Sequence, residues 1–264
     1  MRSLHICVVF LRFSPQLDFI ASPLPCLVSS SVMSLPFDLA EATRHLASID
    51  PKLAELIANT VPFQLHSDQL DSPYEVLLKA IAYQFISGKA AATIFGRVKA
   101  LSNNGRAPSP EQMLKLRKSV LRKAGLSGAK ILAMKDLARK TIEGIVPTLE
   151  QAEKHSDEEL VKRLVSVRGI GAWTVEMFLI FRLGRPDVLP IHDLGVRKGW
   201  SITYGKKQMP TPKELLAFGE RWRPYRTVAS WYMWRACQRG GNAAMRKIRP
   251  AKPRKAKRAS AQGP

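Results

Sequence analysis

From Asp38 onward, the apolar residues of this chain recur at intervals of three and four positions. Val76, Leu77, Ala80 and Ile81 follow this spacing, and no stretch alternates apolar and polar residues cleanly enough to be a strand. Such spacing places the apolar side chains on one face of a helix. We therefore predict an all-α fold of roughly eight to ten helices.

Several of the predicted helices carry recognisable N-terminal capping signals. At Ser72, Ser109 and Thr211, a hydroxyl residue is followed by proline at the first helical position and by Glu or Gln at the third. The hydroxyl and the returning carboxylate or amide satisfy backbone N–H groups that the first turn leaves open, and proline has no N–H there. Asp50, which precedes a proline, and Ser156, which precedes three acidic residues, mark two further helix starts.

The segment 156–183 is predicted to be a pair of helices joined by the turn Gly169-Ile170-Gly171. Two glycines in such a turn allow another molecule to approach the backbone closely, and the N–H groups at the start of the second helix suit a phosphate. The same spacing also occurs in an ordinary connection between two helices. The turn alone therefore leaves both interpretations open.

A second segment, 187–197, contains Pro190 and Asp193. Because Asp193 directly precedes Leu194-Gly195-Val196, it is placed to cap the N-terminus of a helix. A catalytic carboxylate in the same place is the alternative.

Charge and composition narrow the class of partner. The 264 residues include 42 Lys and Arg against 21 Asp and Glu, which gives a net charge of +21 and favours a polyanionic partner such as nucleic acid. Ribosomal and membrane-surface proteins are also this basic. The three cysteines, Cys7, Cys26 and Cys237, show neither a metal-binding spacing nor a disulfide framework, so a reducing compartment is expected. No apolar run reaches the length of a membrane span.

The hairpin glycines followed by Pro190-x-x-Asp193 resemble the helix-hairpin-helix (HhH-GPD) DNA glycosylase superfamily. Three further blocks resemble its DNA-3-methyladenine glycosylase II branch: Gln84 to Ala91, Gly125-Leu126-Ser127 with Lys130, and Trp222-Arg223-Pro224-Tyr225-Arg226. The resemblance covers residues 72–240. It implies a two-lobed helical bundle, and the stretch before Ser72 is too short for the separate N-terminal β domain of larger members. Residues near 34–75 are expected to pack with the C-terminal helices.

The resemblance also implies an activity. Asp193 corresponds to the catalytic carboxylate, which stabilises the positive charge that forms on the sugar as a base departs and can orient the attacking water. Trp173 stands where lyase-competent relatives carry a lysine that forms a Schiff base, and Lys198 lies on another segment. The expected enzyme is thus a monofunctional glycosylase of base excision repair, hydrolysing the N-glycosidic bond of alkylated bases such as 3-methyladenine and leaving an abasic site.

The expected base pocket is aromatic. By the resemblance, Trp173 and Trp234 form walls of the pocket, and Met177 stands where some relatives carry another aromatic residue. An indole face attracts a purine made cationic by alkylation, by about 1 kcal/mol. Trp231 and Trp234 lie three residues apart on one helix face, a spacing equally typical of a protein core.

The DNA contacts implied by the resemblance come from two places. Phe85 is the candidate wedge that fills the gap left by the extruded base, and Gln84 is expected to contact the opposite strand. The alternative for Phe85 is a position in a helix core. In the hairpin, the N–H groups of Gly169 and Gly171 would hold phosphates, and Arg168, where relatives often carry proline, would add a phosphate contact or loosen the turn.

No catalytic metal or cofactor is implied. The resemblance implies a structural monovalent cation bound to the backbone carbonyls of Val165, Val167 and Ile170.

The expected organisation has three parts. Residues 1–33 allow three interpretations: a mis-assigned start with Met33 as the true first residue, a targeting segment, or a real strand or helix. Residues 34–242 are expected to form the glycosylase domain, and residues 243–264 a basic, unfolded tail with eight Lys or Arg and no acid. The tail is either merely solvated or a non-specific phosphate-binding arm.

We expect a monomer that acts on double-stranded DNA containing alkylated bases and does not engage a membrane. It would work in the cytoplasm at the nucleoid of a bacterium, or in the nucleus of a eukaryote. The alternatives are a non-catalytic helix-hairpin-helix DNA-binding module, a glycosylase for a different lesion, and a bifunctional or adenine-mismatch glycosylase, which the absent lysine and cysteine cluster argue against.

Overall fold

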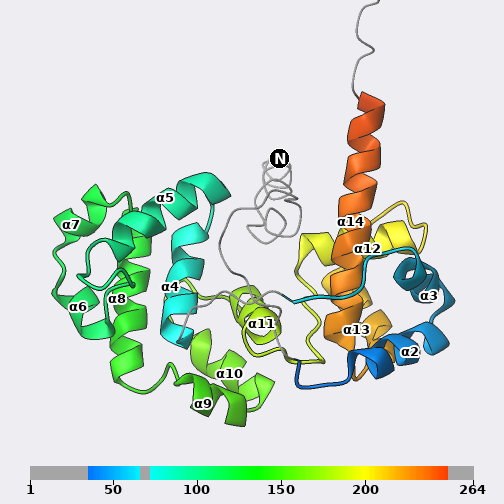
Figure 1. Ribbon diagram of the computed structural model, residues 1–264, viewed down its shortest axis with the longest axis horizontal. Coiled ribbons are helices and arrows are strands. Elements are labelled where there is room, and N and C mark those ends of the chain that lie inside the picture. Colours follow the sequence, from blue (N-terminus) through cyan, green and yellow to red (C-terminus); the bar gives the residue numbers. More distant parts are fainter. Residues whose placement is uncertain (1–34, 66–71, 249–264) are drawn as a thin grey trace, which may run out of the picture.

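A computed structural model describes residues 35–65 and 72–248. The described residues are helical, with no strand, which confirms the predicted all-α class (Figure 1). The elements are α2 (Leu39–Ile49), α3 (Pro51–Ala58), α4 (Pro73–Tyr83), α5 (Gly88–Lys99), α6 (Pro110–Lys115), α7 (Lys118–Lys123), α8 (Gly128–Ile142), α9 (Leu149–Lys154), α10 (Asp157–Leu164), α11 (Ala172–Phe181), α12 (Leu194–Thr203), α13 (Pro212–Gly219), the 3-10 helix η2 (Glu220–Trp222) and α14 (Arg226–Ile248).

The described chain contains thirteen α-helices, more than the roughly eight to ten predicted from periodicity. The excess comes from α6, α7 and α9, each only six residues long. A helix of six residues completes less than two turns, so its apolar residues do not repeat often enough to produce a periodic signal.

The capping signals located the helix starts correctly. Ser109 and Thr211 form complete capping boxes, in which the side chain of the third helical residue returns to the cap backbone. Ser72 and Ser156 accept the expected bonds from Glu75 N–H and Glu159 N–H, but there the glutamate side chains contact other groups. At those two starts the hydroxyl caps the helix without a returning glutamate side chain.

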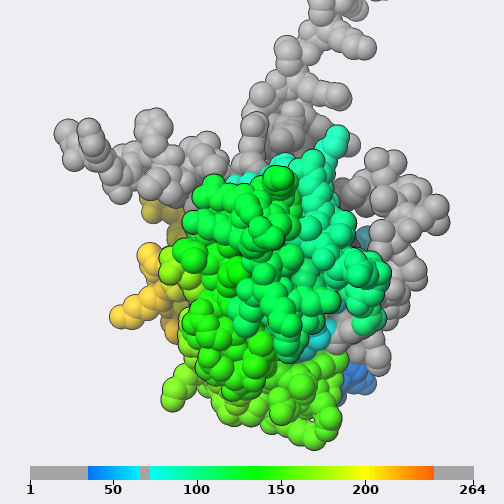
Figure 2. Space-filling view, turned by 90° about the vertical axis from the view of Figure 1, so that its left-hand side faces the viewer, coloured from blue at the N-terminus to red at the C-terminus, as the bar shows by residue number. Residues whose placement is uncertain are grey.

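The helices form two lobes, with α11 between them (Figure 1). Helices α4 to α10 make the first lobe, in which α8 packs against α4 and α6. Figure 2 looks onto this lobe and shows it as one continuous body built from consecutive chain. Helices α2, α3, α12, α13 and α14 make the second lobe, where α12 lies along α14.

The N-terminal helices pack with the C-terminal ones, as predicted for residues 35–65. Helices α2 and α3 contact α14, and Asp50, which caps α3, accepts a hydrogen bond from Tyr204 Oη at 2.5 Å. Residues 73–75 are different, because they begin α4 and belong to the first lobe.

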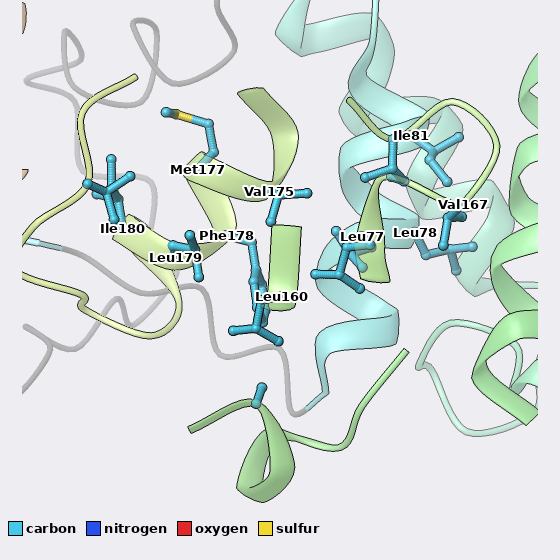
Figure 3. Close-up of a cluster of buried hydrophobic side chains, with 14 of the residues drawn as sticks. Leu77, Leu78, Ile81, Leu160, Val167, Val175, Met177, Phe178, Leu179 and Ile180 are labelled. Carbon is cyan, nitrogen blue, oxygen red and sulfur yellow. The ribbon is translucent and has the colours of Figure 1, made fainter. Parts of the chain in front are cut away.

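Helix α11 is apolar on nearly every side, which is typical of a helix enclosed by protein. Figure 3 shows Leu77 of α4 and Leu160 of α10 beside it, and Met177 pointing away from α4. Because α11 contacts both α4 and α10, it fixes the hairpin within the core.

The last helix, α14, continues to Ile248 and so includes the first six residues of the predicted tail, 243–248. Gly240 and Gly241 lie within this helix and do not end it. Each glycine in a helix costs only about 1 kcal/mol relative to alanine, and the next proline is Pro250. None of the described helices has the length and apolarity needed to cross a membrane.

Candidate active site

Asp193 caps the N-terminus of α12, at the end of the loop that leaves α11. Its Oδ1 accepts a hydrogen bond from Val196 N–H at 2.8 Å, and only 5% of the residue is exposed. The capping role predicted from the local sequence is therefore confirmed. It does not conflict with a catalytic role, because one oxygen of a carboxylate can cap a helix while the other remains available.

Two indole groups, which come from helices far apart in the sequence, hold the carboxylate of Asp193. Trp173 Nε1, on the first turn of α11, donates to Asp193 Oδ2 at 2.8 Å. Trp234 Nε1, on α14, donates to Asp193 Oδ1 at 2.8 Å. The two tryptophans predicted as pocket walls thus lie at the candidate catalytic carboxylate, and both touch it through their N–H groups.

The two oxygens of Asp193 are not equivalent. Oδ1 accepts from both Val196 N–H and Trp234 Nε1, whereas among the described residues Oδ2 accepts from Trp173 Nε1 alone. A carboxylate has about four acceptor positions in all, two on each oxygen. Oδ2 therefore keeps a free acceptor position for a water molecule or for contact with a developing positive charge.

The three predicted pocket residues differ in exposure. Trp173 is half-buried, whereas Trp234 and Met177 are 4% and 5% exposed. One face of Trp234 stacks on the ring of Phe181, with centroids 5.6 Å apart. Of the three, Trp173 can therefore present the most surface to a base. The pocket role of all three stays a prediction.

The loop that carries Asp193 is attached to α14 by an ion pair. Arg226 Nε and Nη2 donate to Asp187 Oδ1 and Oδ2 at 2.7 and 3.1 Å. Arg226 belongs to the 222–226 block that supported the resemblance, so this block positions the loop. Gly195 is also required, because a Cβ there would lie 2.8 Å from Trp234 Cδ1.

The two glycines of the hairpin between α10 and α11 differ in how strictly the structure requires glycine. Gly169 adopts φ +78°, a conformation that favours glycine, and a Cβ would lie 3.2 Å from the Cβ of Ala133. A Cβ on Gly171 would meet nothing within 4 Å. Both residues are exposed, and within the described residues neither backbone N–H donates a hydrogen bond. Their amides are thus available to a ligand.

Helix α8 holds this turn in place. Asp136 Oδ2 accepts from Arg168 N–H at 2.9 Å, a bond that a proline at that position could not make. Lys140 Nζ pairs with Asp136 Oδ2 at 3.2 Å and also donates to the carbonyl of Ser166. Partial burial acts to raise the pKa of Asp136, but the hydrogen bond from Arg168 N–H, the Lys140 ammonium group and the Arg139 guanidinium group hold it below its usual value. Arg168 therefore does not loosen the turn, and its side chain is exposed.

The candidate wedge lies next to the hairpin. Helix α4 ends at Tyr83, so Phe85 is not in a helix core; it is 79% exposed and adopts φ +60°. Gln84 Nε2 donates to the carbonyl of Gly169 at 2.8 Å, and so connects the wedge loop to the hairpin. Lys130 Nζ donates to the carbonyl of Ala82 at 2.8 Å and fixes the end of α4. The structure therefore brings Phe85, Gln84 and Gly169 together.

One residue near Asp193 was missed by the sequence analysis. Glu176 lies one turn after Trp173 on α11, and its Oε2 is buried without a hydrogen-bond partner among the described residues. Burial, and then the negative charge of Asp193, raise the pKa of Glu176 to about 7. Its position three residues after Trp173 was the only available signal, and its significance depends on Asp193, which is distant in sequence.

The predicted cation ligands are the carbonyls of Val165, Val167 and Ile170. The carbonyl of Val167 accepts from Ile170 N–H at 3.0 Å, and within the described residues those of Val165 and Ile170 accept no such bond in the turn. Each carbonyl oxygen therefore has a free acceptor position, and the cation site stays a prediction. Among the described residues, no three His, Cys, Asp or Glu side chains gather in a way that could hold a metal ion.

Comparison with known proteins shows which family the chain belongs to. Residues 78–224 match the HhH-GPD superfamily of base excision DNA repair proteins. DNA-3-methyladenine glycosylase 1 of Schizosaccharomyces pombe is 42% identical over 200 residues, which cover 75% of this chain and 87% of that protein.

Two solved structures share the fold. The S. pombe 3-methyladenine DNA glycosylase in complex with abasic DNA matches with a TM-score of 0.66 at 40% identity, covering 74% of this chain and 95% of that one. The DNA-3-methyladenine glycosidase of Bacillus halodurans matches with a TM-score of 0.69 at 29% identity, covering 81% and 95%. The chain belongs to the HhH-GPD superfamily of base excision DNA repair proteins.

Proposed function

We propose that this protein is a monofunctional DNA glycosylase that hydrolyses the N-glycosidic bond of alkylated bases such as 3-methyladenine and leaves an abasic site. The observation that carries the proposal is the buried Asp193 carboxylate, oriented by two indole N–H groups and placed beside a hairpin with free amides. The similarity to DNA-3-methyladenine glycosylases supports the lesion class.

Asp193 supplies the chemistry of bond cleavage. As the bond between C1′ and the base breaks, its electron pair leaves with the base and positive charge develops on the sugar. The carboxylate, fixed in advance, stabilises this charge without having to reorganise. Oδ2, with its free acceptor position, orients the water that then adds to C1′, and the proton of that water passes to the carboxylate or to solvent.

A lysine nucleophile is missing from the place where a lyase would need one. Trp173 occupies that place and uses its indole N–H on Asp193. Lys198 lies on α12 and is exposed. Because an indole cannot form a Schiff base, the sugar is attacked by water and the DNA strand stays intact.

DNA would be held at two adjoining places. The N–H groups of Gly169 and Gly171 face a phosphate at the start of α11, where the helix dipole also favours an anion. Phe85 enters the duplex at the position of the extruded base. The hydrogen bond from Gln84 to the carbonyl of Gly169 fixes the position of this wedge relative to the phosphate site. Arg168 adds a phosphate contact beside them. A direct contact of Gln84 with the opposite strand stays a prediction.

A monovalent cation on the carbonyls of Val165, Val167 and Ile170 would stiffen the turn and add positive charge near the phosphate. The protein would act as a monomer, in whichever compartment holds the DNA: at the nucleoid of a bacterium or in the nucleus of a eukaryote. No cofactor is assigned to the reaction.

The test is base release from methylated duplex DNA by the purified full chain, with strand scission followed on the same samples. Release of methylated purines without scission is the expected result. Release with scission would instead indicate a lyase, and DNA binding without any release would indicate a non-catalytic binding module.

A further inference from the structure

A second carboxyl group, that of Glu176, lies next to the residues predicted to form the base pocket, and the function proposed above does not use it. Glu176 follows Trp173 by three residues on α11, and residues at this spacing are neighbours on a helix surface. The Trp173 indole donates to Asp193 Oδ2, and the charge of Asp193 acts on Glu176. Glu176, Trp173 and Asp193 therefore form one cluster, which also adjoins Met177.

The environment of Glu176 is that of a neutral acid. The residue as a whole is half-buried, and its Oε2 is buried without a hydrogen-bond partner among the described residues. A buried charge without a partner is costly, whereas a protonated carboxyl group carries no charge and has a hydrogen to donate. Asp193, in contrast, accepts three N–H donors. Two neighbouring carboxyl groups in such different environments are suited to opposite roles, one as acid and one as carboxylate.

We propose that Glu176 is a general acid that protonates the departing base, and that this extends excision to modified purines that carry no positive charge. The inference rests on the glycosylase function proposed above. A purine alkylated at a ring nitrogen is already cationic and leaves as a neutral base. An uncharged base takes the electron pair of the bond and would leave as an anion. A proton on the base removes this negative charge.

The proposed step balances as a hydrolysis. The C1′–N bond breaks and its electron pair goes to the base, while the Glu176 proton moves to a ring nitrogen of that base. Asp193 stabilises the sugar cation until water adds to C1′ and gives up a proton. Glu176, now a carboxylate, takes a proton back from water, so the protein is unchanged at the end of the cycle.

The experiment compares two substrate classes with one set of proteins. Duplex oligonucleotides carry a single 7-methylguanine, which is cationic, or a single hypoxanthine or 1,N6-ethenoadenine, which are uncharged. Single-turnover release is measured for wild type, Glu176→Gln and Glu176→Ala. Glu143→Gln, which changes an exposed glutamate at the end of α8, is the matched control. Thermal melting of each protein checks that it is folded.

A general acid typically contributes about 100-fold or more, so both Glu176 variants should lose that much on the uncharged bases and less than about threefold on 7-methylguanine. Equal losses on both classes would assign Glu176 a structural role and overturn the proposal. So would an absence of loss, or a wild-type protein that releases 7-methylguanine but no uncharged base. Failure of wild type to release 7-methylguanine would instead reject the glycosylase function itself.

Discussion

Trp173 Nε1 and Trp234 Nε1 each lie 2.8 Å from Asp193, the first on Oδ2 and the second on Oδ1. The two indoles come from α11 and α14, so the orientation of the carboxylate depends on the packing of the central helix and the second lobe. Trp173 and Trp234, the predicted walls of the base pocket, thus also position Asp193, the proposed catalytic carboxylate.

Replacing Trp234 with phenylalanine should slow base release. The change keeps a ring that can stack on Phe181 and removes the N–H that holds Asp193 Oδ1. A hydrogen bond to a charged group contributes about 1.5 to 3 kcal/mol, so a roughly 10- to 100-fold lower single-turnover rate is expected. Trp200→Phe is the control, because Trp200 Nε1 is buried without a partner among the described residues. Equal effects of both substitutions would show that Trp234 acts only through packing.

Replacing Phe85 with glycine should change stability and activity in opposite directions. A phenylalanine at φ +60° is strained, and glycine adopts this conformation without cost, so the free energy of unfolding should rise by about 1 kcal/mol. The exposed ring is lost, and base release from duplex DNA should fall about tenfold or more because the extruded state is no longer supported. Phe85→Leu, which keeps an apolar side chain, should retain most activity. Unchanged release by the glycine variant would reject the wedge.

The two hairpin glycines should respond differently to alanine. Gly169→Ala forces a side chain into the left-handed region and against Ala133, which should cost about 1 to 2 kcal/mol of stability. Gly171→Ala meets nothing in the protein, so stability should change by less than about 0.5 kcal/mol. Its methyl group nevertheless occupies the approach to the free amides, and DNA affinity should fall. Wild-type DNA affinity of a stable Gly171→Ala protein would place the phosphate elsewhere.

Much of this architecture was predictable because its determinants are local. Ser109 and Thr211 specify their helix starts through hydroxyl and side-chain contacts within four residues, and the structure shows both capping boxes complete. The short helices α6, α7 and α9 were not individually resolved by periodicity, because so few residues cannot repeat a pattern. The predicted start of the tail at residue 243 was wrong, because α14 continues to Ile248.

The site was predictable only where the resemblance supplied long-range information. Asp193 has the local sequence of a helix cap, and nothing nearby indicates that two indoles converge on it. Phe85 lies one residue beyond the C-cap of α4, a boundary that a continuous apolar stretch conceals. Glu176 becomes noteworthy only when tertiary packing places it near Asp193 and leaves its oxygen unpaired.

The stability of the protein should depend on the ionisation of Glu176. Its pKa is raised to about 7 by burial and by Asp193, so between its ordinary pKa and pH 7 the folded state holds a proton that the unfolded state has lost. Stability contributed by the neutral acid is fully present at low pH and is lost as pH rises toward and through 7. Glu176→Gln, which cannot ionise, should therefore exceed wild type in stability at pH 8, by about 1 to 3 kcal/mol.

The measurement is denaturant unfolding of both proteins from pH 4 to pH 8. Subtracting the free energies of unfolding of the two proteins cancels the titration of all other groups. This difference should be near zero at pH 4 and grow as pH rises. A difference that does not vary with pH would contradict the raised pKa.

The most direct test of the central claim is single-turnover release of 7-methylguanine from duplex DNA by wild type and Asp193→Asn. Asparagine has nearly the same shape and can still cap α12, so DNA affinity should stay within about threefold of wild type. Without the negative charge, the rate should fall about 100-fold or more. An Asp193→Asn protein that releases the base at a rate close to wild type would contradict the assignment of Asp193 as the catalytic carboxylate.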